Sequence, residues 1–552
     1  MDTELIDSLS KELKVSKVIS HLLISRGVKT YEDAERFFRP QISDLHDPFL
    51  MKGMQNAVDR ILLAIRKSEK ILIYGDYDVD GTTSVSMMYS FLIRFSDNIG
   101  YYIPDRYKEG YGVSFKGIDY AQLNDYSLII ALDCGTRAVK QVEYASNKGI
   151  DFIICDHHTP GTNIPLATSI LNPKQEDCQY PYKELSGCGV GFKLIQAISQ
   201  SKNISFTEIA EYLDLLTLSI GADIVDMTGE NRVLAFYGLR VINKDPRIGI
   251  KELIRRSGKE GEISISDLIF GVAPRINAAG RIDHGKIAVE LLIQTDQEEA
   301  RQLSKKIETY NSNRKILDKN ITEEALSMID VTKKSTVVHS QDWHKGVLGI
   351  VASRLIDIHY KPTIVLLEEE EVFSGSARSV KGFNIYDALL ECDHLLEEFG
   401  GHKYAAGLTI KKKNLNQFID EFEKVVSKNI SKTHLENQIV AETVISLEEI
   451  SSKLYRIIKQ FEPFGPKNTR PYFLTKGVLE NGEAKIIGKE KNHVKFKLRT
   501  ENGEISCIGF GMGHQIDKIQ INKKFDICYS INENIWNGHK TLQLILRDIH
   551  FN

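Results

Sequence analysis

The sequence of 552 residues is defined first by features that it lacks. It has no apolar run of the roughly 20 residues that a membrane-spanning helix needs, so we predict no transmembrane segment. Its first residues are acidic and contain no apolar core, so a secretory signal peptide is not expected. We also find no internal repeat and no low-complexity tract.

Cysteine is scarce, and neither sign of charge is in large excess. The seven cysteines form no CxxC pair and their number is odd, which predicts reduced thiols in a cytoplasmic protein without structural zinc. The net charge of −4 gives no overall indication of a nucleic-acid ligand, so any basic surface must be local. The length alone predicts about three or four domains.

The most informative segment is an apolar run that begins at Ile71 and continues into three carboxylates at every second position. On a strand, that spacing points all three side chains the same way. Because three like charges so close together repel, divalent metal ions held by oxygen ligands are the favoured explanation, and a solvated acidic turn is the alternative. Gly81 is expected to end the strand and to precede a helix. The carboxylates belong to Asp76, Asp78 and Asp80.

Two further apolar segments repeat this arrangement. Residues 127–132 end at Asp133, and residues 151–155 end at Asp156-His157-His158. The carboxyl edge of an open parallel sheet is where ligands bind. Three successive strand ends with Asp or His therefore predict a metal cluster at that edge.

The remaining chain predicts an α/β protein with a small β-rich end. Strands and helices alternate from 70 to about 160, as in a parallel sheet, and residues 297–329 look like one long connecting helix. A second α/β region follows, with strands at 335–339 and 363–367. Short alternating runs after about 432 predict a small β-barrel. Its segment 493–499 carries basic residues on one face, which suit either a solvated surface or a track for a nucleic-acid backbone.

The order of these motifs resembles that of the DHH phosphoesterase superfamily and, within it, the RecJ single-stranded-DNA exonucleases. The resemblance covers nearly the whole chain, and the combination of motifs is far more specific than the DHH triplet alone. It rests on Phe37–Pro40, Asp44–Phe49, Tyr74–Gly81, Pro104–Gly112, Asp133, Asp156-His157-His158, Gly221-Ala222-Asp223, Pro274–Arg281, Gly400-Gly401-His402 and the terminal OB-like barrel.

The resemblance implies a parallel-sheet DHH domain and a second α/β, DHH-associated lobe, joined by a long helix and followed by a C-terminal OB-like β-barrel. The predicted domains are a helical leader (1–48), the DHH catalytic domain (49–245), the arginine motif with the connector helix (246–330), the DHH-associated substrate-binding domain (331–431) and the barrel (432–552).

The resemblance also implies two bound divalent ions, Mn²⁺ or Mg²⁺. Asp78 would bind one ion and Asp80 the other, with Asp133 bridging both. His157 and Asp223 would complete the second site, and Asp76 would be a ligand or an outer group. Some superfamily members have a histidine where this chain has Tyr74, which leaves the first site without a nitrogen ligand.

The expected chemistry is metal-assisted hydrolysis without a covalent intermediate. Two ions activate a water and neutralise the phosphodiester transition state, so no side-chain nucleophile is required. Asp133 is expected to be catalytic through the ions. His158 is expected to donate a hydrogen bond to a phosphate oxygen or to assist the leaving group.

A second set of residues is expected to bind the substrate and anchor its 5′ end. Arginine forks suit phosphate oxygens. Arg275 and Arg281 flank a predicted glycine-containing turn, Arg378 lies in a second at 375–379, and a third is predicted at 400–407. Tyr107, Tyr111 and Tyr404 are available for base stacking and are equally plausible as turn or core residues. The substrate-binding set is Arg106, Arg275, Asn277, Arg281, Arg378, Gly400, Gly401 and His402.

The leading hypothesis is a metal-dependent 5′→3′ exonuclease that degrades single-stranded DNA to nucleotides in recombination and DNA repair. The alternatives are a nanoRNase or cyclic-dinucleotide phosphodiesterase of the same superfamily, and an inactive DNA-binding scaffold. Expected partners are single-stranded DNA and, by resemblance alone, a single-strand-binding protein and a helicase. We expect a cytoplasmic monomer.

Overall fold

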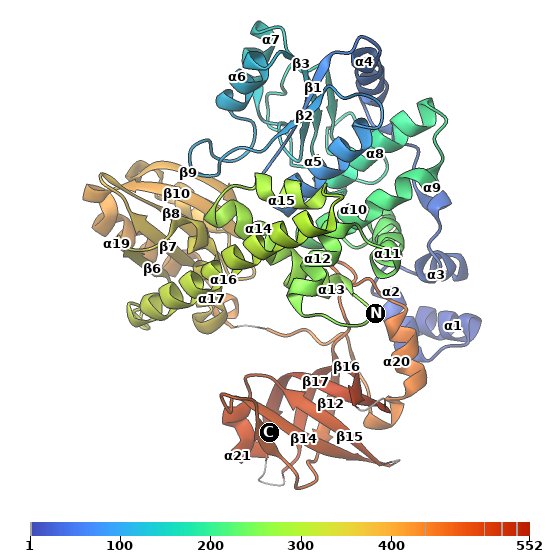
Figure 1. The fold of residues 1–552 in the computed structure, drawn as a ribbon. Helices are drawn as coiled ribbons and strands as arrows, with labels where there is room; N and C mark the ends of the chain where they lie inside the picture. Colours follow the sequence, from blue (N-terminus) through green and yellow to red (C-terminus); the bar gives the residue numbers. More distant parts are fainter. Residues whose placement is uncertain (1–2, 437, 502, 520–522, 537–538, 552) are drawn as a thin grey trace. The chain divides into compact units, whose positions relative to one another are not determined.

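The computed structural model describes residues 3–436, 438–501, 503–519, 523–536 and 539–551. The chain forms two units (Figure 1). The first comprises residues 1–104, 111–273 and 439–552, and the second comprises residues 105–110 and 274–438. The short segment 105–110 therefore interrupts the first unit along the chain.

The first unit contains a five-stranded parallel sheet with the strand order β2-β1-β3-β4-β5. The strand order reverses beside β1, and such a switch point forms a ligand-binding crevice at the carboxyl ends of the strands. The strands are β1 (Lys70–Gly75), β2 (Ile99–Tyr102), β3 (Tyr126–Leu132), β4 (Asp151–Cys155) and β5 (Ser169–Leu171).

Helices cover both faces of this sheet, as its nearly continuous apolar strands require. Helices α6 and α7 pack on one face, and α4, α5 and α8 pack on the other (Figure 1). The helices are α4 (Met54–Arg66), α5 (Val79–Leu92), α6 (Phe115–Leu123), α7 (Val139–Asn147) and α8 (Gly187–Ser201).

A helical region follows the sheet. The buried helix α10 packs against α5, α8 and α11, so the region is anchored to the sheet. Its helices are α9 (Phe206–Ile209), α10 (Leu213–Ala222), α11 (Gly229–Lys244), α12 (Ile248–Ser257), α13 (Ile265–Asp267) and the π-helical turn η4 (Leu268–Val272).

The second unit contains a mixed sheet with the order β6-β7-β8-β10-β9. Alternate residues of β7 face opposite cores: Ile364 and Leu366 pack towards α18 and α19, whereas Val365 packs towards α16 and α17. The strands are β6 (Thr336–Ser340), β7 (Thr363–Glu368), β8 (Val372–Arg378), β9 (Leu396–His402) and β10 (Ala405–Lys411). The helices are α14 (Ala273–Ile282), which begins at the unit boundary, α15 (Lys286–Leu292), α16 (Gln297–Ser327), α17 (Leu348–His359), α18 (Ile385–Glu391) and α19 (Leu415–Asn429).

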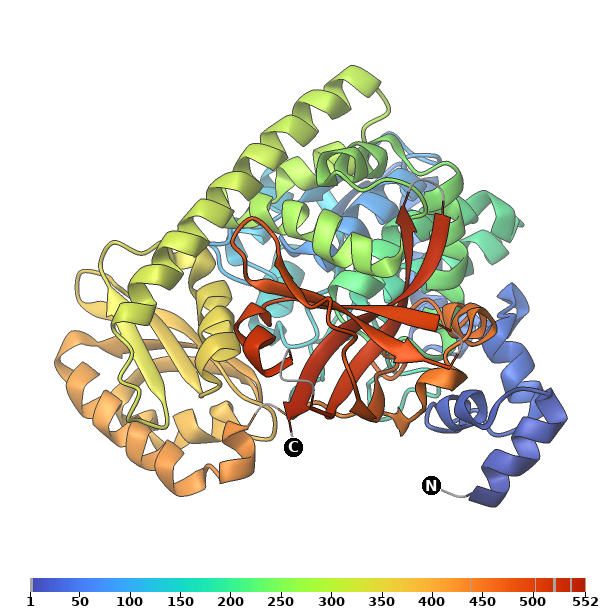
Figure 2. The same ribbon diagram turned by 90° about the horizontal axis from the view of Figure 1, so that it is seen from below.

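Helix α16 confirms the predicted long helix, because 31 residues run without a break from Gln297 to Ser327 (Figure 2). The whole helix lies within the second unit. Asp296 caps its N-terminus by accepting hydrogen bonds from the amides of Glu298 and Glu299. The absence of Gly and Pro from this stretch permits an uninterrupted helix of this length.

The C-terminal part of the first unit is a seven-stranded sheet with the order β11-β12-β16-β17-β15-β14-β13. Its longest strands, β16 and β17, run antiparallel side by side (Figure 2). The strands are β11 (Thr443–Val444), β12 (Phe473–Val478), β13 (Lys485–Ile487), β14 (His493–Thr500), β15 (Gly503–Gly509), β16 (Phe525–Trp536) and β17 (His539–Phe551). Strand β13 was absent from our prediction, because Lys485-Ile486-Ile487 is too short to show an alternating pattern.

Strand β14 has the predicted alternation, with Val494, Phe496 and Leu498 buried and basic residues between them. One of those residues, Lys497, is paired: its Nζ lies 3.0 Å from carboxylate oxygens of both Glu483 and Glu504. The basic face is therefore partly neutralised within the sheet.

The N-terminal helices and the C-terminal sheet share one hydrophobic core, although more than 400 residues separate them. Leu22 and Leu23 belong to the same buried cluster as Phe461 and Phe473. Arg26 makes a bidentate contact with Glu442, with distances of 2.7 and 3.0 Å. The N-terminal helices are α1 (Thr3–Leu13), α2 (Lys17–Ile24) and α3 (Tyr31–Phe38), and the helix that precedes β12 is α20 (Ser452–Lys459).

Candidate metal centre

The register of the first sheet brings its acidic strand ends together. Gly75 at the end of β1 pairs with Leu132 at the end of β3, and Leu132 pairs with Cys155 at the end of β4. The residues that follow these three positions are Asp76, Asp133 and Asp156. The predicted cluster at the carboxyl edge of the sheet is therefore present.

The prediction that Asp76, Asp78 and Asp80 share one strand is wrong. Strand β1 ends at Gly75, Asp78 is the N-cap of α5 and accepts a hydrogen bond from the Gly81 amide (3.0 Å), and Asp80 lies in the first helical turn. Asp is a preferred N-cap residue, and two Thr follow Gly81. The chain therefore begins a helix after Asp78 instead of continuing the strand. Asp76 is completely buried, whereas Asp78 is partly exposed.

Asp80 is held by the N-terminus of α8. Its Oδ2 accepts a hydrogen bond from the Gly187 amide (2.7 Å), and its Oδ1 accepts one from the Cys188 amide (2.8 Å). The hydroxyl of Ser219 donates a third hydrogen bond to Oδ1 (2.6 Å). These three hydrogen bonds hold the Asp80 side chain in one orientation at the N-terminus of the helix.

Asp133 has a left-handed backbone, with φ of 60°. This conformation is uncommon for a residue with a Cβ and tends to persist at functional sites. Gly187 makes the position possible, because a Cβ on Gly187 would lie only 2.6 to 2.7 Å from atoms of Asp133. Close packing of α8 against the end of β3 thus places Asp80 and Asp133 at one site.

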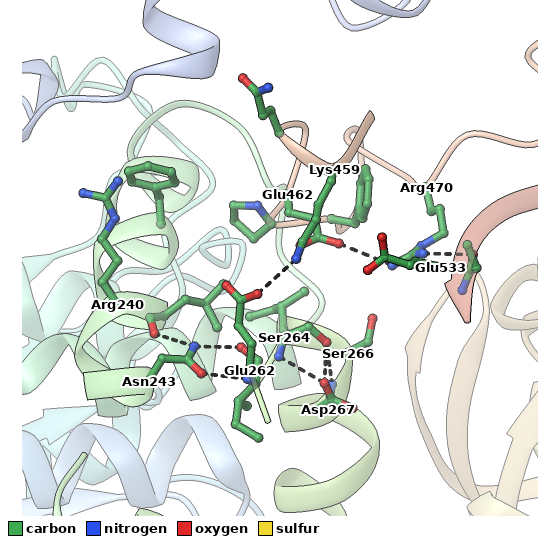
Figure 3. Close-up of a pocket in the computed structure, with 18 of the residues that line it drawn as sticks. Arg240, Asn243, Glu262, Ser264, Ser266, Asp267, Lys459, Glu462, Arg470 and Glu533 are labelled. Carbon is green, nitrogen blue, oxygen red and sulfur yellow. Dashed lines mark hydrogen bonds and ion pairs between the residues drawn. The ribbon is translucent and has the colours of Figure 1, made fainter. Parts of the chain in front are cut away.

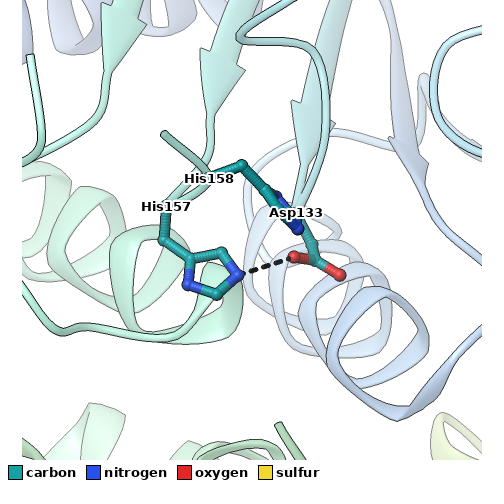
Figure 4. A group of neighbouring side chains, drawn as sticks. All are labelled: Asp133, His157 and His158. Carbon is teal, nitrogen blue, oxygen red and sulfur yellow. Dashed lines mark ion pairs between the residues drawn. The ribbon is translucent and has the colours of Figure 1, made fainter. Parts of the chain in front are cut away.

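His157 lies among three carboxylates. Its Nε2 is 3.3 Å from Asp133, 3.5 Å from Asp223 and 3.8 Å from Asp80. Figure 4 shows the ring directed at the Asp133 carboxylate. Both ring nitrogens of His157 and Oδ1 of Asp133 are buried without a hydrogen-bond partner among the described residues.

The carboxylates of the cluster destabilise one another. Burial and then the neighbouring Asp80 and Asp78 raise the pKa of Asp223 to about 9. The pKa of Asp133 is also raised, by burial and by the same neighbours. Burial lowers the pKa of His157, so its imidazole is neutral and has a free lone pair. A cation at this position would relieve the repulsion between the carboxylates.

The donors fit a divalent metal ion. The ligand atoms of Asp80, His157 and Asp223 lie within 4.8 Å of one another, and so do those of Asp133, His157 and His158. Mixed carboxylate and imidazole donors suit Mn²⁺ and accept Mg²⁺. The two groups overlap at His157. Asp78 lies close enough to Asp80 for the two charges to interact strongly.

His158 is held beside the cluster rather than within it. Its Nδ1 lies 2.8 Å from Oδ1 of Asp156, and that oxygen also accepts hydrogen bonds from the amides of His157 and His158. The hydroxyl of Tyr111 lies 3.2 Å from the other ring nitrogen, Nε2. Asp156 is thus a buried support for both histidines, a role that the sequence prediction did not assign.

Tyr74 points away from the cluster. Its hydroxyl donates to the carbonyl of Gly112 (2.9 Å) and accepts from the amide of Ser114 (3.1 Å). The ring is completely buried and stacks on Tyr102. Tyr74 therefore has a packing role in the described structure.

The second unit gathers the predicted arginines. Burial and the nearby Arg106, Arg314 and Arg378 lower the pKa of Arg281 to about 10. Burial and Arg106 likewise lower the pKa of Arg378. Several guanidinium groups that destabilise one another form a site that an anion such as phosphate stabilises.

The prediction that Arg275, Arg281 and Arg378 lie in or beside glycine-containing turns is wrong. Arg275, Asn277 and Arg281 all lie in helix α14, and Arg378 ends strand β8. Arg275 is nearly buried and forms an ion pair with Glu308 at 2.5 Å, so its charge is already compensated. The glycines misled the prediction, since Gly280 continues a helix here. Gly400, Gly401 and His402 lie on the exposed strand β9 rather than in a turn.

The structure adds positions that the sequence did not single out. Ser219 and Gly187 contact the acidic cluster. Each lies in a buried helix whose sequence resembles that of any other core helix. Lys174 also acts on the site, because its charge lowers the pKa of both Asp223 and His157. No local motif marks these residues, and only the folded chain brings them to the cluster.

A cavity of about 830 Å³ lies elsewhere in the first unit, between α11, α13 and α20 (Figure 3). Two ion pairs border it, between Lys459 and Glu262 at 3.0 Å and between Arg470 and Glu462 at 3.5 Å. It is lined by none of the predicted site residues, so it is separate from the acidic cluster.

Comparisons with known proteins agree with this architecture. The family model described as "DHH family, N-terminal domain" matches residues 70–220, the DHHA1 domain matches 332–428, and the RecJ OB domain matches 441–548. The single-stranded-DNA-specific exonuclease RecJ of Bacillus subtilis is 38% identical over 99% of this chain and 70% of its own length. The RecJ of Salmonella typhimurium is 30% identical over 96% of this chain and 95% of its own length.

Solved structures give the same fold. The crystal structure of RecJ in complex with Mn²⁺ from Thermus thermophilus matches with a TM-score of 0.87 at 24% identity, over 100% of this chain and 78% of that one. A crystal structure of exonuclease RecJ bound to manganese matches with a TM-score of 0.63 at 28% identity, over 72% of this chain and 100% of that one.

The parallel sheet with its Asp and His cluster, followed by a DHHA1 domain, defines the class as that of the DHH proteins. The additional OB domain and the relatives narrow this class further. The chain belongs to the RecJ family. Within the described residues, no helix has both the length and the apolar character needed to cross a membrane.

Proposed function

We propose that this chain is a metal-dependent hydrolase that degrades single-stranded DNA to nucleotides from the 5′ end. The relatives named above are single-stranded-DNA-specific exonucleases, which supports both the substrate and the reaction. The single observation that carries the chemistry is the His157 ring among three carboxylates, with both nitrogens free of other described partners.

We assign the metal ligands as Asp78, Asp80, Asp133, His157 and Asp223, with Asp76 as a ligand or a buried outer group. When bound, two Mn²⁺ or Mg²⁺ ions supply an activated water and neutralise charge on the phosphodiester. Matched RecJ crystal structures contain Mn²⁺ or Mg²⁺, which supports this choice of ion. The protein's part is to hold its carboxylates in fixed directions, as α8 does for Asp80.

His158 is proposed to act on the phosphate next to the ions. Asp156 holds its Nδ1, so the Nε2 side of the ring is the side that contacts other groups. From there the imidazole can hydrogen-bond a phosphate oxygen or assist departure of the leaving oxygen. No side-chain nucleophile is required, and the reaction proceeds without a covalent intermediate.

Substrate binding is proposed for the second unit. Burial and the charge of Arg106 lower the pKa of both Arg281 and Arg378, so a phosphate group bound there would stabilise their charged forms. We propose that this group anchors the 5′ end. Exposed elements of the same unit would contribute further contacts with the strand. These proposed contacts are Asn277, Gly400, Gly401 and His402, with Arg275 supporting the site through Glu308.

We further propose that the predicted domains divide the work. Residues 49–245 would carry catalysis, 331–431 substrate binding and 432–552 further contact with the strand, while 1–48 and 246–330 support and connect them. We place the protein in the cytoplasm, acting as a monomer in recombination and repair. A single-strand-binding protein and a helicase are the proposed partners, and their binding can be measured by co-purification with the full chain.

The test is digestion of long single-stranded DNA labelled at either end, with Mn²⁺, Mg²⁺ or EDTA. We expect labelled mononucleotide to appear at once from the 5′ label and late from the 3′ label. EDTA and Asp133→Ala should both abolish the release. Degradation restricted to oligomers of two to five nucleotides would instead support a small-oligonucleotide phosphodiesterase, and metal binding without hydrolysis would support a scaffold.

A further inference from the structure

Tyr111 makes a contact with the site that stacking on DNA bases does not explain. Its hydroxyl lies 3.2 Å from Nε2 of His158 and 3.4 Å from the carbonyl oxygen of Asp133. The tyrosine is 55% exposed, so its ring faces solvent while its hydroxyl reaches the ends of β3 and β4. The hydroxyl, and not the ring, is therefore the part of Tyr111 that contacts the site.

His158 is held through both of its ring nitrogens. Asp156 accepts two backbone amide hydrogen bonds on the same oxygen that meets His158 Nδ1, so the proton of a neutral ring lies on Nδ1. Nε2 lies against the hydroxyl of Tyr111, so the two groups share one hydrogen bond whose proton can come from either side. A ring held at two points keeps one orientation, as histidines at metal sites generally require.

The backbone is left-handed at both residues next to Tyr111. Gly110 and Gly112, on either side of it, have φ of +83° and +79°. A Cβ on Gly110 would meet nothing within 4 Å, so the glycine serves the backbone conformation rather than close packing. Two left-handed residues reverse the chain so that Tyr111 turns towards His158.

Tyr111 also stands where the chain passes from one unit to the other. Residues 105–110 belong to the second unit, where the hydroxyl of Tyr107 donates to the carbonyl of Arg281. Arg106, in the same short segment, interacts electrostatically with Arg281 and Arg378. Tyr111 thus directly follows a short segment that carries Arg106, one of the proposed phosphate-binding arginines.

We propose that Tyr111 is a positioning residue for hydrolysis. Its phenol fixes the His158 ring beside the metal ligands, at the point where the chain returns to the first unit after residues 105–110. The expected effect on kcat rests on the proposed function. The structural part of the inference concerns only the histidine ring and can be measured in metal-free protein.

The test is Tyr111→Phe, which removes the hydroxyl and keeps the ring. We expect kcat on long single-stranded DNA to fall about 10- to 100-fold, with KM changed less than about threefold and Mn²⁺ affinity unchanged. Tyr120→Phe is the control, since Tyr120 is another partly exposed tyrosine of the first unit. Its kinetics should match those of the wild type.

A second measurement isolates the ring itself. In metal-free protein with ¹⁵N-labelled histidine, we expect the Nε2 resonance of His158 to differ between the wild type and Tyr111→Phe, while Nδ1 stays protonated in both because Asp156 accepts from it. A change in this signal without DNA hydrolysis by the wild type would refute the proposed function and leave the positioning role intact.

A double-mutant cycle adds the energetic test. Asp156→Asn and Tyr111→Phe both act through His158, so the double variant should be no more than about twofold slower than Asp156→Asn alone. Additive losses, an unchanged His158 signal, or a raised KM at constant kcat would each overturn the proposal. The last result would make Tyr111 a simple DNA contact.

Discussion

At the scale of single residues, the metal centre depends on positions that carry no charge. Gly187 brings α8 within contact of Asp133, and Ser219 donates a hydrogen bond to Asp80. Residues that orient metal ligands typically change metal affinity or activity 10- to 100-fold when they are replaced. Both positions can be tested without touching a proposed ligand.

Gly187→Ala should disrupt the centre by steric conflict. The new methyl group would lie 2.6 to 2.7 Å from Asp133, including its backbone Cα, so Asp133 must move. We expect Mn²⁺ affinity, measured by calorimetry, to fall at least about tenfold. Gly189→Ala in the same helix is the control, because its methyl group meets only the Leu185 and Ser186 side chains, at 3.3 Å or more. Equal losses in the two variants would contradict the account.

Ser219→Ala should weaken the centre by removing a hydrogen-bond donor. Oδ1 of Asp80 would keep the Cys188 amide but lose the hydroxyl at 2.6 Å. We expect Mn²⁺ affinity to fall about 10-fold while the fold is retained. Ser199→Ala is matched to it, because the buried Ser199 hydroxyl has no hydrogen-bond partner among the described residues, and its loss should leave Mn²⁺ affinity unchanged.

The raised pKa of Asp223 predicts how stability depends on pH in metal-free protein. The folded state retains a proton up to about pH 9, whereas an ordinary Asp releases it near 3.8. This contribution to stability is complete below pH 3.8 and is lost as the pH rises towards about 9. Between pH 7 and 9, where His157 is neutral in both states, we expect Tm in EDTA to fall and the Mn²⁺-induced gain in Tm to grow.

Asp223→Asn is the control for this pH dependence. It has no proton to lose, so its Tm in EDTA should vary less with pH than that of the wild type. A wild-type profile as flat as that of the variant would show that Asp223 does not titrate in this range.

At the scale of elements, strand ends and helix starts explain which parts of the site the sequence could predict. Apolar runs ending in Asp133 and Asp156 indicated parallel strands with acidic ends, and the register places these residues side by side. Capping was harder to see, because Asp76, Asp78 and Asp80 have the spacing of a strand although α5 begins between them. Local spacing does not determine where a strand ends and a helix begins when both can use the same residues.

Glycine also misled the prediction at this scale. Gly280 lies within helix α14, and Gly375 and Gly400 lie within strands β8 and β9. A Cβ on Gly375 would meet the carbonyl of Val365 at 2.1 Å, so this glycine allows close approach of strands rather than a turn. Tertiary packing decides such cases, and it cannot be read from the local sequence.

Arg232 of helix α11 joins two parts of the first unit that are far apart in the sequence. The guanidinium of Arg232 is buried and donates hydrogen bonds to the carbonyls of Phe37 (3.0 Å) and Phe461 (2.8 Å). Arg232→Ala would remove the donor to the Phe37 carbonyl and one of two donors to the Phe461 carbonyl, which also accepts from Nδ2 of Asn468 (2.8 Å). We expect the free energy of unfolding in urea to fall by about 2 to 3 kcal/mol.

Arg240→Ala is the matched control on the same helix. Arg240 is exposed and stacks over Phe236 at 4.1 Å. Its replacement should change the free energy of unfolding by less than about 1 kcal/mol. If Arg240→Ala lowered the free energy of unfolding as much as Arg232→Ala, burial of the guanidinium would not explain the contribution of Arg232 to stability.

At the scale of the whole molecule, the sequence indicated the classes of element but not the distant partnerships. The parallel sheet, the long helix and the β-rich C-terminal part were all predicted. The core shared by the N-terminal helices and the C-terminal sheet was not, since contacts between residues such as Leu22 and Phe473 leave no local pattern. The assignment of residues 105–110 to the second unit was likewise invisible, because it depends on contacts with Arg281.

Asp80, Asp133, His157 and Asp223, together with Asp78, are proposed to hold two metal ions at the edge of the sheet. The most direct measurement is anomalous diffraction at the manganese edge from crystals grown with Mn²⁺. We predict two anomalous peaks per chain, both contacting Asp133, with one also contacting His157 and Asp223. Loss of both peaks in Asp133→Ala crystals would agree with this account. Strong manganese peaks elsewhere, with none among these side chains in the wild type, would contradict it.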